Sequence, residues 1–230
     1  MNIYFLGGGN MAAAIAGGLV RQGGHRVHIA NRGKEKRERL AEELGVSVSE
    51  KLPELAADDV LVLAVKPQDM QAACQGVQTN GALVLSVAAG LSIATLSRYL
   101  GGTRRIVRVM PNTPGKIGLG VSGMFADDSV SDQDKAAADS IMRAVGITVW
   151  LDGEERLHDI TGISGSGPAY VFYLLDALKQ AARQQGFDEK EAHRLSLATF
   201  KAGQVAETVV KGVAACVNRS RELAKQFEAV

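Results

Sequence analysis

The first dozen residues constrain the fold more than any other stretch of this chain. An apolar strand over residues 2–6 leads into three consecutive glycines, and a helix is expected over residues 10–23. Gly7, Gly9 and Ala12 have the G-x-G-x-x-G/A spacing, in which the first glycine makes a tight turn and the second admits a pyrophosphate. The small third residue lets helix and strand pack closely. The stretch therefore predicts a dinucleotide-binding turn, with the phosphates at the helix N-terminus.

A second string with this spacing, Gly118–Gly123, lacks the strand-to-helix context. It leads into residues 121–125, which are apolar and favour an extended strand. In a chain of 230 residues with 26 glycines, roughly one chance match of this kind is expected. We interpret the second string as a glycine-rich turn and not as a binding site.

Strands and helices alternate along the first 153 residues. Further strands are expected at residues 26–30, 46–48, 59–65, 82–87, 105–110, 121–125 and 147–151. The most apolar of these are typical of parallel strands that are covered on both faces. Four strand ends carry glycine, alanine, proline or amide residues, and ligands of open α/β sheets bind beyond the carboxyl ends of the strands. The pattern predicts an α/β Rossmann domain over residues 1–153.

From residue 154 to residue 230 only helical periodicity is found, which predicts a second, smaller all-α domain. The helix expected over residues 169–184 is apolar on nearly all sides as far as Leu178, so we expect it to be buried. Asp188 is placed to cap another helix. Valines at positions 205, 209, 213 and 217 form a stripe at helical spacing, typical of packed core or of a seam with a partner helix.

Composition excludes several classes of protein. The net charge is +1, which provides no electrostatic basis for binding nucleic acid or a membrane surface. Two cysteines, Cys74 and Cys216, are too few for a disulfide framework or a zinc site, and no metal is expected. The sequence contains no apolar run of 18 residues and no signal-peptide pattern at its start. We therefore expect a cytoplasmic protein.

The residues after the second strand favour NADP over NAD. An acid at this point would hold the ribose 2′-hydroxyl of NAD, whereas an arginine can take the 2′-phosphate of NADP. The chain has no acid there and instead carries Asn31 and Arg32, followed by Lys34, Lys36 and Arg37. The alternative is that these charges form a solvated helix face. For Arg32, directly after the strand, we expect contact with the phosphate.

Several strings, taken together, resemble the pyrroline-5-carboxylate reductase family. They are residues 5–11 (FLGGGNM), 64–67 (AVKP), 86–90 (SVAAG), 108–114 (RVMPNTP) and 162–170 (GISGSGPAY). The resemblance implies an oxidoreductase that reduces the cyclic imine 1-pyrroline-5-carboxylate to L-proline with NADPH, the last step of proline biosynthesis. The alternatives are another NADP-dependent imine or β-hydroxyacid reductase, or a nucleotide-binding relative without catalysis.

The resemblance also implies the residues of the site. By family resemblance the cofactor contacts are Leu6, Gly7, Gly8, Gly9, Asn10, Met11, Asn31, Ala64, Val65, Lys66, Pro67, Val87, Ala88 and Ala89. Asn112 is expected near the nicotinamide. Ser164, Ser166 and the backbone N–H groups at the start of the Pro168 helix offer donors for a substrate carboxylate. An ordinary helix cap is an equally good interpretation of these serines.

The chain departs from the family pattern near its end. The family has a stretch of two glycines followed by threonines that grips the substrate carboxylate and builds the dimer, and this chain lacks it. Residues 198–201 are followed almost directly by residues 204–217, which resemble the family's final helix, with its cysteine at Cys216. We therefore expect one long helix, or two helices with a bend at Gly203, and a smaller and weaker homodimer through the C-terminal helices. Cofactor binding should persist while reduction is slow or undetectable. The valine stripe is expected to pack on the helix at residues 169–178 or on a second copy of the tail.

Overall fold

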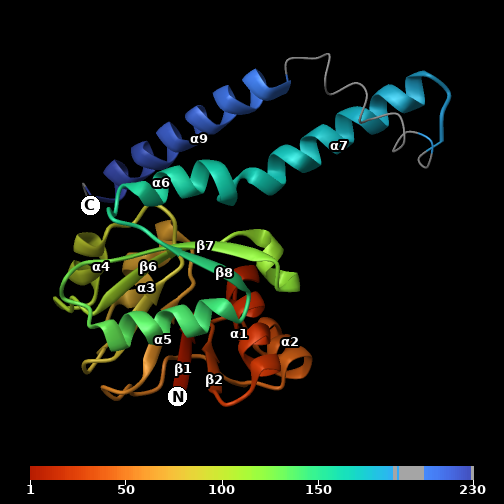
Figure 1. Cartoon of the computed structure of the whole chain (residues 1–230). Coiled ribbons are helices and arrows are strands. Elements are labelled where there is room, and N and C mark those ends of the chain that lie inside the picture. Colours follow the sequence, from red (N-terminus) through yellow and green to blue (C-terminus); the bar gives the residue numbers. More distant parts are fainter. Residues whose placement is uncertain (189–190, 192–204, 229–230) are drawn as a thin grey trace.

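The structure of the chain is a computed structural model, which describes residues 1–188, Glu191 and residues 205–228. Within these residues, eight strands form one sheet in the spatial order β3-β2-β1-β4-β5-β6-β7-β8 (Figure 1). The strands are β1 (Asn2–Leu6), β2 (Arg26–Ala30), β3 (Ser47–Ser49), β4 (Val60–Leu63), β5 (Leu83–Ser86), β6 (Ile106–Met110), β7 (Gly120–Ala126) and β8 (Gly146–Trp150).

Strands β1 to β6 run parallel to one another, while β7 is antiparallel to β6 and β8 is parallel to β7. The chain runs outward from β1 through β2 to β3 and then returns to place β4 on the other side of β1. Connections therefore leave β1 and β4 in opposite directions, which opens a crevice at their carboxyl ends. This α/β fold confirms the predicted class.

The sheet has a hydrophobic core on each face, because successive side chains of a strand point to opposite sides. On one face Phe5 and Val62 pack with α1 (Asn10–Gln22) and α5 (Asp132–Arg143). On the other face Leu61 and Leu63 pack with α3 (Met70–Cys74) and α4 (Ile93–Tyr99). Helix α2 (Lys34–Leu44) contributes Leu40 to the first core. The turn at Gly7–Gly9 therefore follows a strand that is covered by helices on both faces.

Local sequence signals set the starts of the helices. The Ser92 hydroxyl accepts the Thr95 N–H at 3.2 Å and so caps the start of α4. Helix α5 begins in the same way after Ser131. Only the start of the predicted glycine-rich turn at residues 118–123 is a turn: Gly118 ends a short 3-10 helix, η2 (Thr113–Ile117), and residues 120–123 already belong to β7.

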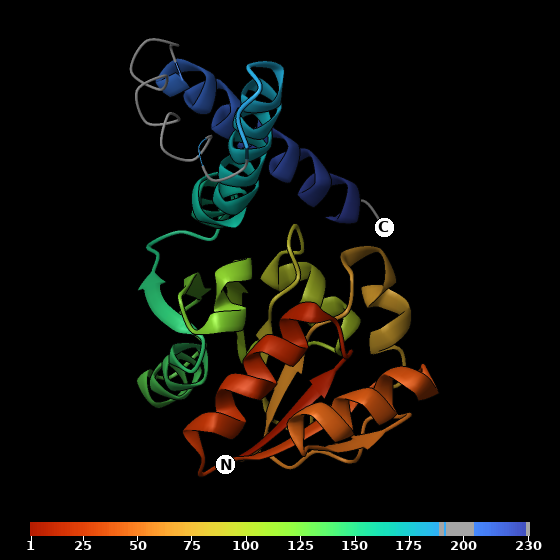
Figure 2. The ribbon, with the colours of Figure 1, turned by 90° about the vertical axis from the view of Figure 1, so that its right-hand side faces the viewer.

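The helical part stands on the carboxyl edge of the sheet (Figures 1 and 2). It begins with α6 (Arg156–Ile160), continues as a π-helical turn, η3 (Thr161–Gly165), and leads into α7 (Gly167–Gln184). Helix α9 (Val205–Glu228) lies across α6 and η3. None of the described helices is both long and apolar enough to cross a bilayer.

Two expectations about these helices are wrong. The apolar half of α7 is not buried: Val171, Phe172 and Tyr173 are 56%, 68% and 81% exposed, because α7 projects away from the sheet and no described segment covers this face. The described part of the valine stripe does not pack on α7 either, while packing of the stripe on a second copy of the tail stays a prediction. Its described side chains, Val213 and Val217, lie against Gly162 of η3, since that residue has no side chain to keep the helix away.

Other expectations about the tail concern residues that lie outside the described part of the chain. These include the helix after Asp188 and the bend at Gly203. Asp188 itself is described, and its carboxylate accepts the Glu191 N–H at 2.9 Å while the Glu191 carboxylate accepts the Asp188 N–H at 3.3 Å. This reciprocal pair is a capping box and supports the predicted cap.

Candidate functional site

The turn between β1 and α1 requires glycine for two different reasons. Gly7 has φ +99°, and a Cβ there would lie 2.7 Å from Val65 Cγ1 and 2.8 Å from the Ala64 carbonyl oxygen. Gly9 has ordinary extended geometry, and a Cβ there would meet only the Ala64 oxygen, at 3.6 Å. Gly7 is thus required by the fold, whereas the bare backbone at Gly9 leaves room for a ligand.

The N-terminus of α1 is open to an anion. Gly9 is the N-cap residue, and no side chain caps this helix. The first N–H groups of a helix have no intrahelical partner, and the helix dipole favours negative charge near them. The geometry therefore fits a pyrophosphate at this helix end.

The loop after β2 is held in a defined shape by side chains. The Asn31 side-chain oxygen accepts the Gly8 N–H at 3.2 Å, which ties this loop to the glycine turn. Arg37 Nη1 donates to the carbonyl oxygens of Asn31 and Arg32, each at 2.7 Å. The Arg37 guanidinium is thus engaged with the loop backbone, which leaves Arg32 and Lys36 as the cationic residues of this loop and helix that line the cavity.

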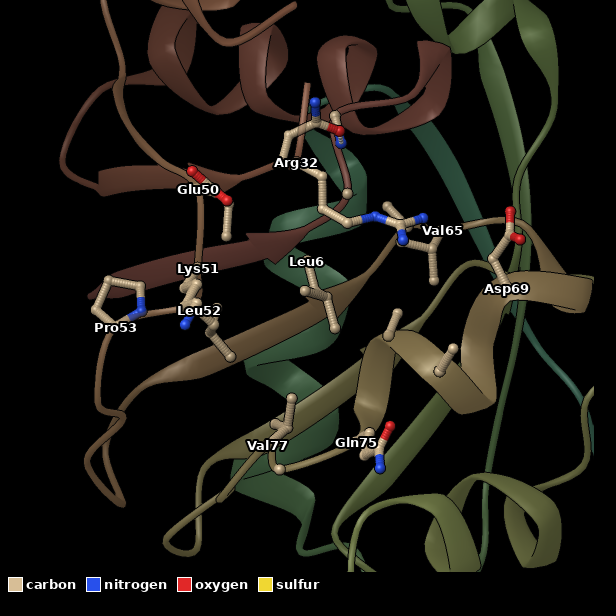
Figure 3. A pocket seen from close by; sticks show the side chains of 18 of the residues that line it. Leu6, Arg32, Glu50, Lys51, Leu52, Pro53, Val65, Asp69, Gln75 and Val77 are labelled. Carbon is tan, nitrogen blue, oxygen red and sulfur yellow. Dashed lines mark hydrogen bonds between the residues drawn. The ribbon is translucent and has the colours of Figure 1, made fainter. Parts of the chain in front are cut away.

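These elements form the walls of a cavity of about 850 Å³ at the carboxyl ends of β1, β2, β3 and β4 (Figure 3). Such a volume is in the range of small-molecule and cofactor sites. The sequence-predicted residues that line it are Leu6, Gly7, Gly8, Gly9, Asn31, Arg32, Ala64, Val65 and Lys66. Figure 3 shows the Arg32 side chain extending over the cavity toward Val65. Strand β4 ends at Leu63, earlier than expected, and so releases residues 64–66 to the wall.

Other predicted cofactor residues do not line this cavity. They are Asn10, Met11, Pro67, Val87, Ala88 and Ala89. Asn10 and Met11 begin α1, and Pro67 begins the 3-10 helix η1 (Pro67–Asp69). Ala88 is 6% exposed in the second core. For this group, contact with a cofactor stays a prediction.

The sequence analysis missed two walls of the cavity. One is the segment after β3, residues 50–54, and the other is the segment after α3, residues 75–78, together with Asn80. Neither carries a recognisable motif. The position of the first, directly after a strand of a parallel sheet, is the one signal that would have indicated it.

The three residues expected near the substrate lie together, outside this cavity. The Asn112 amide donates to the Ser164 carbonyl oxygen at 3.1 Å and accepts the Val121 N–H at 2.9 Å. The Ser164 hydroxyl donates to the Ile160 carbonyl oxygen at 3.3 Å, and the Ser166 hydroxyl lies 2.8 Å from Cys216 Sγ. Asn112, 8% exposed, therefore ties the end of β6 to residues 162–166, which we call the serine segment.

Among the described residues, no cluster of three or more His, Cys, Asp or Glu side chains could hold a metal ion. Burial lowers the pKa of His28, whose ring nitrogens lie 2.8 Å and 2.7 Å from the hydroxyls of Ser47 and Ser49. His158 Nδ1 lies 2.8 Å from the Ser220 hydroxyl. Both rings thus have hydrogen-bond partners within the fold.

Two family models match the chain. Residues 2–90 match "NADP oxidoreductase coenzyme F420-dependent", and residues 154–204 match "Pyrroline-5-carboxylate reductase dimerisation". The pyrroline-5-carboxylate reductase of Pseudomonas aeruginosa is 42% identical over 203 residues, which cover 86% of this chain and 74% of that protein. The solved structure of a pyrroline-5-carboxylate reductase from Coxiella burnetii is 32% identical, with a TM-score of 0.81 over 97% of this chain and 98% of that chain.

A third relative bears on the shortened tail. The pyrroline-5-carboxylate reductase of Haemophilus influenzae is 34% identical, and the alignment covers 98% of both proteins. It runs over 267 positions, although this chain has 230 residues. That relative therefore has residues to which nothing in this chain corresponds, in keeping with the shorter segment noted in the sequence.

Proposed function

Because the chain belongs to the pyrroline-5-carboxylate reductase family, we propose that it reduces 1-pyrroline-5-carboxylate to L-proline with NADPH. The observation that carries the proposal is the identity of 34–42% to such enzymes over most of the chain. The predicted family and fold class are confirmed. The chain is an oxidoreductase, and this identity favours it over the other reductases and the non-catalytic relative considered from the sequence.

We propose that the cavity holds the adenosine and pyrophosphate part of NADP, which is supported by its place at the glycine turn and the end of β2. We propose that the open backbone at Gly9 and the first turn of α1 hold the pyrophosphate. Arg32, supported by Lys36, takes the 2′-phosphate, since both line the same cavity. Asn31 fixes the loop to the glycine turn through the Gly8 N–H. When bound, NADPH supplies the hydride that the imine carbon accepts.

We place the substrate at the serine segment. A protonated imine accepts hydride more readily, so the protein has to orient the substrate and hold its carboxylate. We propose the Ser166 hydroxyl as a donor for that carboxylate, together with the Ser164 hydroxyl once it turns away from the Ile160 carbonyl oxygen. The N–H groups at the start of α7, expected from the sequence as further donors, are engaged within the helix: those of Ala169 and Tyr170 donate to the Ser166 carbonyl oxygen, and Pro168 has none. Asn112 holds the Ser164 carbonyl oxygen, so we assign it the positioning of this segment.

The dimerisation match indicates a homo-oligomer. We propose a homodimer through the C-terminal helices, supported by the exposed apolar face of α7 formed by Val171, Phe172, Tyr173 and Leu175. We also propose that the Rossmann domain ends at residue 153 and the helical domain begins at residue 154, where the second family match starts. A cytoplasmic location is the remaining part of the proposal, supported by the unpaired cysteines Cys74 and Cys216.

The test is NADPH oxidation by the purified chain with and without 1-pyrroline-5-carboxylate, with L-proline measured as the product. A cyclic imine without a carboxylate serves as the control substrate. We expect oxidation that depends on 1-pyrroline-5-carboxylate and a much lower rate with the control imine. Equal rates on both would indicate a general imine reductase. NADPH binding without turnover would indicate a non-catalytic relative.

A further inference from the structure

The serine segment is held from two sides by elements far apart in the sequence. On the sheet side, Asn112 binds the Ser164 carbonyl oxygen, and Met110 Cε approaches Gly165 so closely that a Cβ there would lie 2.9 Å away. On the other side lies α9, whose Val213 and Val217 pack on Gly162. The turn η3 is π-helical, a conformation frequent at functional sites. Its contacts with the sheet and with α9 together fix the positions of its polar groups.

Helix α9 also makes a polar contact with the segment. Cys216 Sγ lies 2.8 Å from the Ser166 hydroxyl, at the junction of η3 and α7. The Tyr170 hydroxyl next to this pair donates to the Gly162 carbonyl oxygen at 3.1 Å. Burial raises the pKa of the Tyr170 phenol, and the neighbouring Cys216 raises it further. A thiol, an aliphatic hydroxyl and a phenol thus meet where α9 crosses the segment.

The far end of α9 reaches the Rossmann part. A Cβ on Gly90 would lie 3.6 Å from a ring carbon of Phe227 and 3.7 Å from Leu223 Cβ. Gly90 directly follows the predicted cofactor residues 87–89. Figures 1 and 2 show the C-terminal end of α9 beside this part of the molecule. One helix therefore contacts both the serine segment and the turn after β5.

We propose that Cys216 is a positioning residue for the reduction, which acts by holding the Ser166 hydroxyl in place for the substrate carboxylate. This rests on the proposed function, which assigns Ser166 to that carboxylate. A serine hydroxyl has one donor and two acceptor sites. When the Cys216 thiol donates to Ser166 Oγ, the Ser166 O–H stays available for the carboxylate. The hydrophobic contacts of α9 keep the thiol at this position.

The test compares Cys216→Ala, Cys216→Ser, Ser166→Ala and the double variant Cys216→Ala/Ser166→Ala in the full-length chain. Cys216→Ala removes the thiol donor with little change in volume, whereas Cys216→Ser keeps a donor. We expect Cys216→Ala to raise the KM for 1-pyrroline-5-carboxylate about three- to tenfold, in line with the loss of one hydrogen bond. Cys216→Ser should restore it to within about twofold. The Kd of NADPH should stay unchanged in both. Cys74→Ala is the matched control, since Cys74 lies in the second core, away from the segment.

The double variant separates positioning from packing. If Cys216 acts through Ser166, Cys216→Ala should change nothing further once Ser166 is alanine. An unchanged KM in Cys216→Ala, or the same rise in the Ser166→Ala background, would overturn the inference. Binding of L-proline to the NADP⁺ complex provides a second measurement. If the unaltered chain shows no turnover and does not bind L-proline, the proposed function is refuted and the inference with it. Normal turnover by the unaltered chain, together with an unchanged KM in Cys216→Ala, would refute the inference alone.

Discussion

Replacing Arg32 by alanine tests the assignment of the 2′-phosphate. Arg32 is exposed and lines the cavity directly after β2. Its guanidinium lies over the cavity (Figure 3), whereas Arg37 is engaged with the backbone carbonyl groups of the same loop. We expect the Arg32→Ala variant to bind NADPH more weakly and NADH as before, because the 2′-phosphate is present in NADPH and absent in NADH.

The size of the effect follows from the exposure of Arg32. A hydrogen bond to a charged group contributes about 1.5–3 kcal/mol, which corresponds to a factor of about 10 to 150 in affinity. Solvent screens an exposed charge pair and lowers its contribution. Lys36 lines the same cavity and keeps part of the attraction. We therefore expect a loss at the lower end, about 10- to 30-fold in the Kd of NADPH.

The assay is a fluorescence titration of both cofactors at fixed ionic strength. Arg26→Ala is the matched control, because Arg26 is an exposed arginine at the opposite end of β2 and its replacement by alanine removes the same charge. Salt should weaken NADPH binding less in Arg32→Ala than in the unaltered chain, because screening acts on the lost interaction. Equal weakening of NADPH and NADH, or equal losses in Arg26→Ala and Arg32→Ala, would refute the reasoning.

Three further predictions concern the turn, the fold and the assembly. Gly9→Val should keep the fold by circular dichroism, because its backbone is unstrained, and should abolish NADPH binding in a titration; normal binding would place the pyrophosphate elsewhere. Asp134 accepts hydrogen bonds from Arg105 at 2.9 and 2.6 Å, which hold the pKa of its carboxyl below the usual range. Its carboxylate therefore stabilises the fold above an unfolded pKa of about 3.9, and the contribution is lost as pH falls through the lower native pKa. Asp134→Asn should reduce the free energy of unfolding by about 1–2 kcal/mol at pH 7, and a difference from the unaltered chain that persists at pH 2 in urea titrations would contradict this. Phe172→Asp should dissociate the homodimer in sedimentation experiments, while Ile117→Asp, which alters another exposed apolar side chain, should not.

Local signals in the sequence were enough to predict the strands, the start of α1 and the glycine turn. The constraint at Gly7 is of this kind, because a positive φ and a close backbone approach leave glycine as the residue that fits. The caps at Ser92 and Ser131 involve residues three apart. The motif strings determined the family, since their spacing can be read along the chain without knowledge of the fold.

Tertiary structure decided which residues share the cavity and what each one does there. Residues 50–54 and 75–78 join the wall because the sheet order brings β3 and α3 toward the same crevice, which no local pattern encodes. Arg37 and Arg32 look alike in sequence, yet one binds carbonyl oxygens and the other lines the cavity.

The same holds for the helical part. Periodicity showed that α7 has an apolar face and that the valines of α9 form a stripe, but periodicity does not specify the partner of either face. The structure leaves the α7 face exposed and places α9 on Gly162, with Cys216 against Ser166, although these two residues lie 50 positions apart. Pattern along the chain determines which elements form and which faces are apolar, whereas contacts between distant segments depend on how the elements pack.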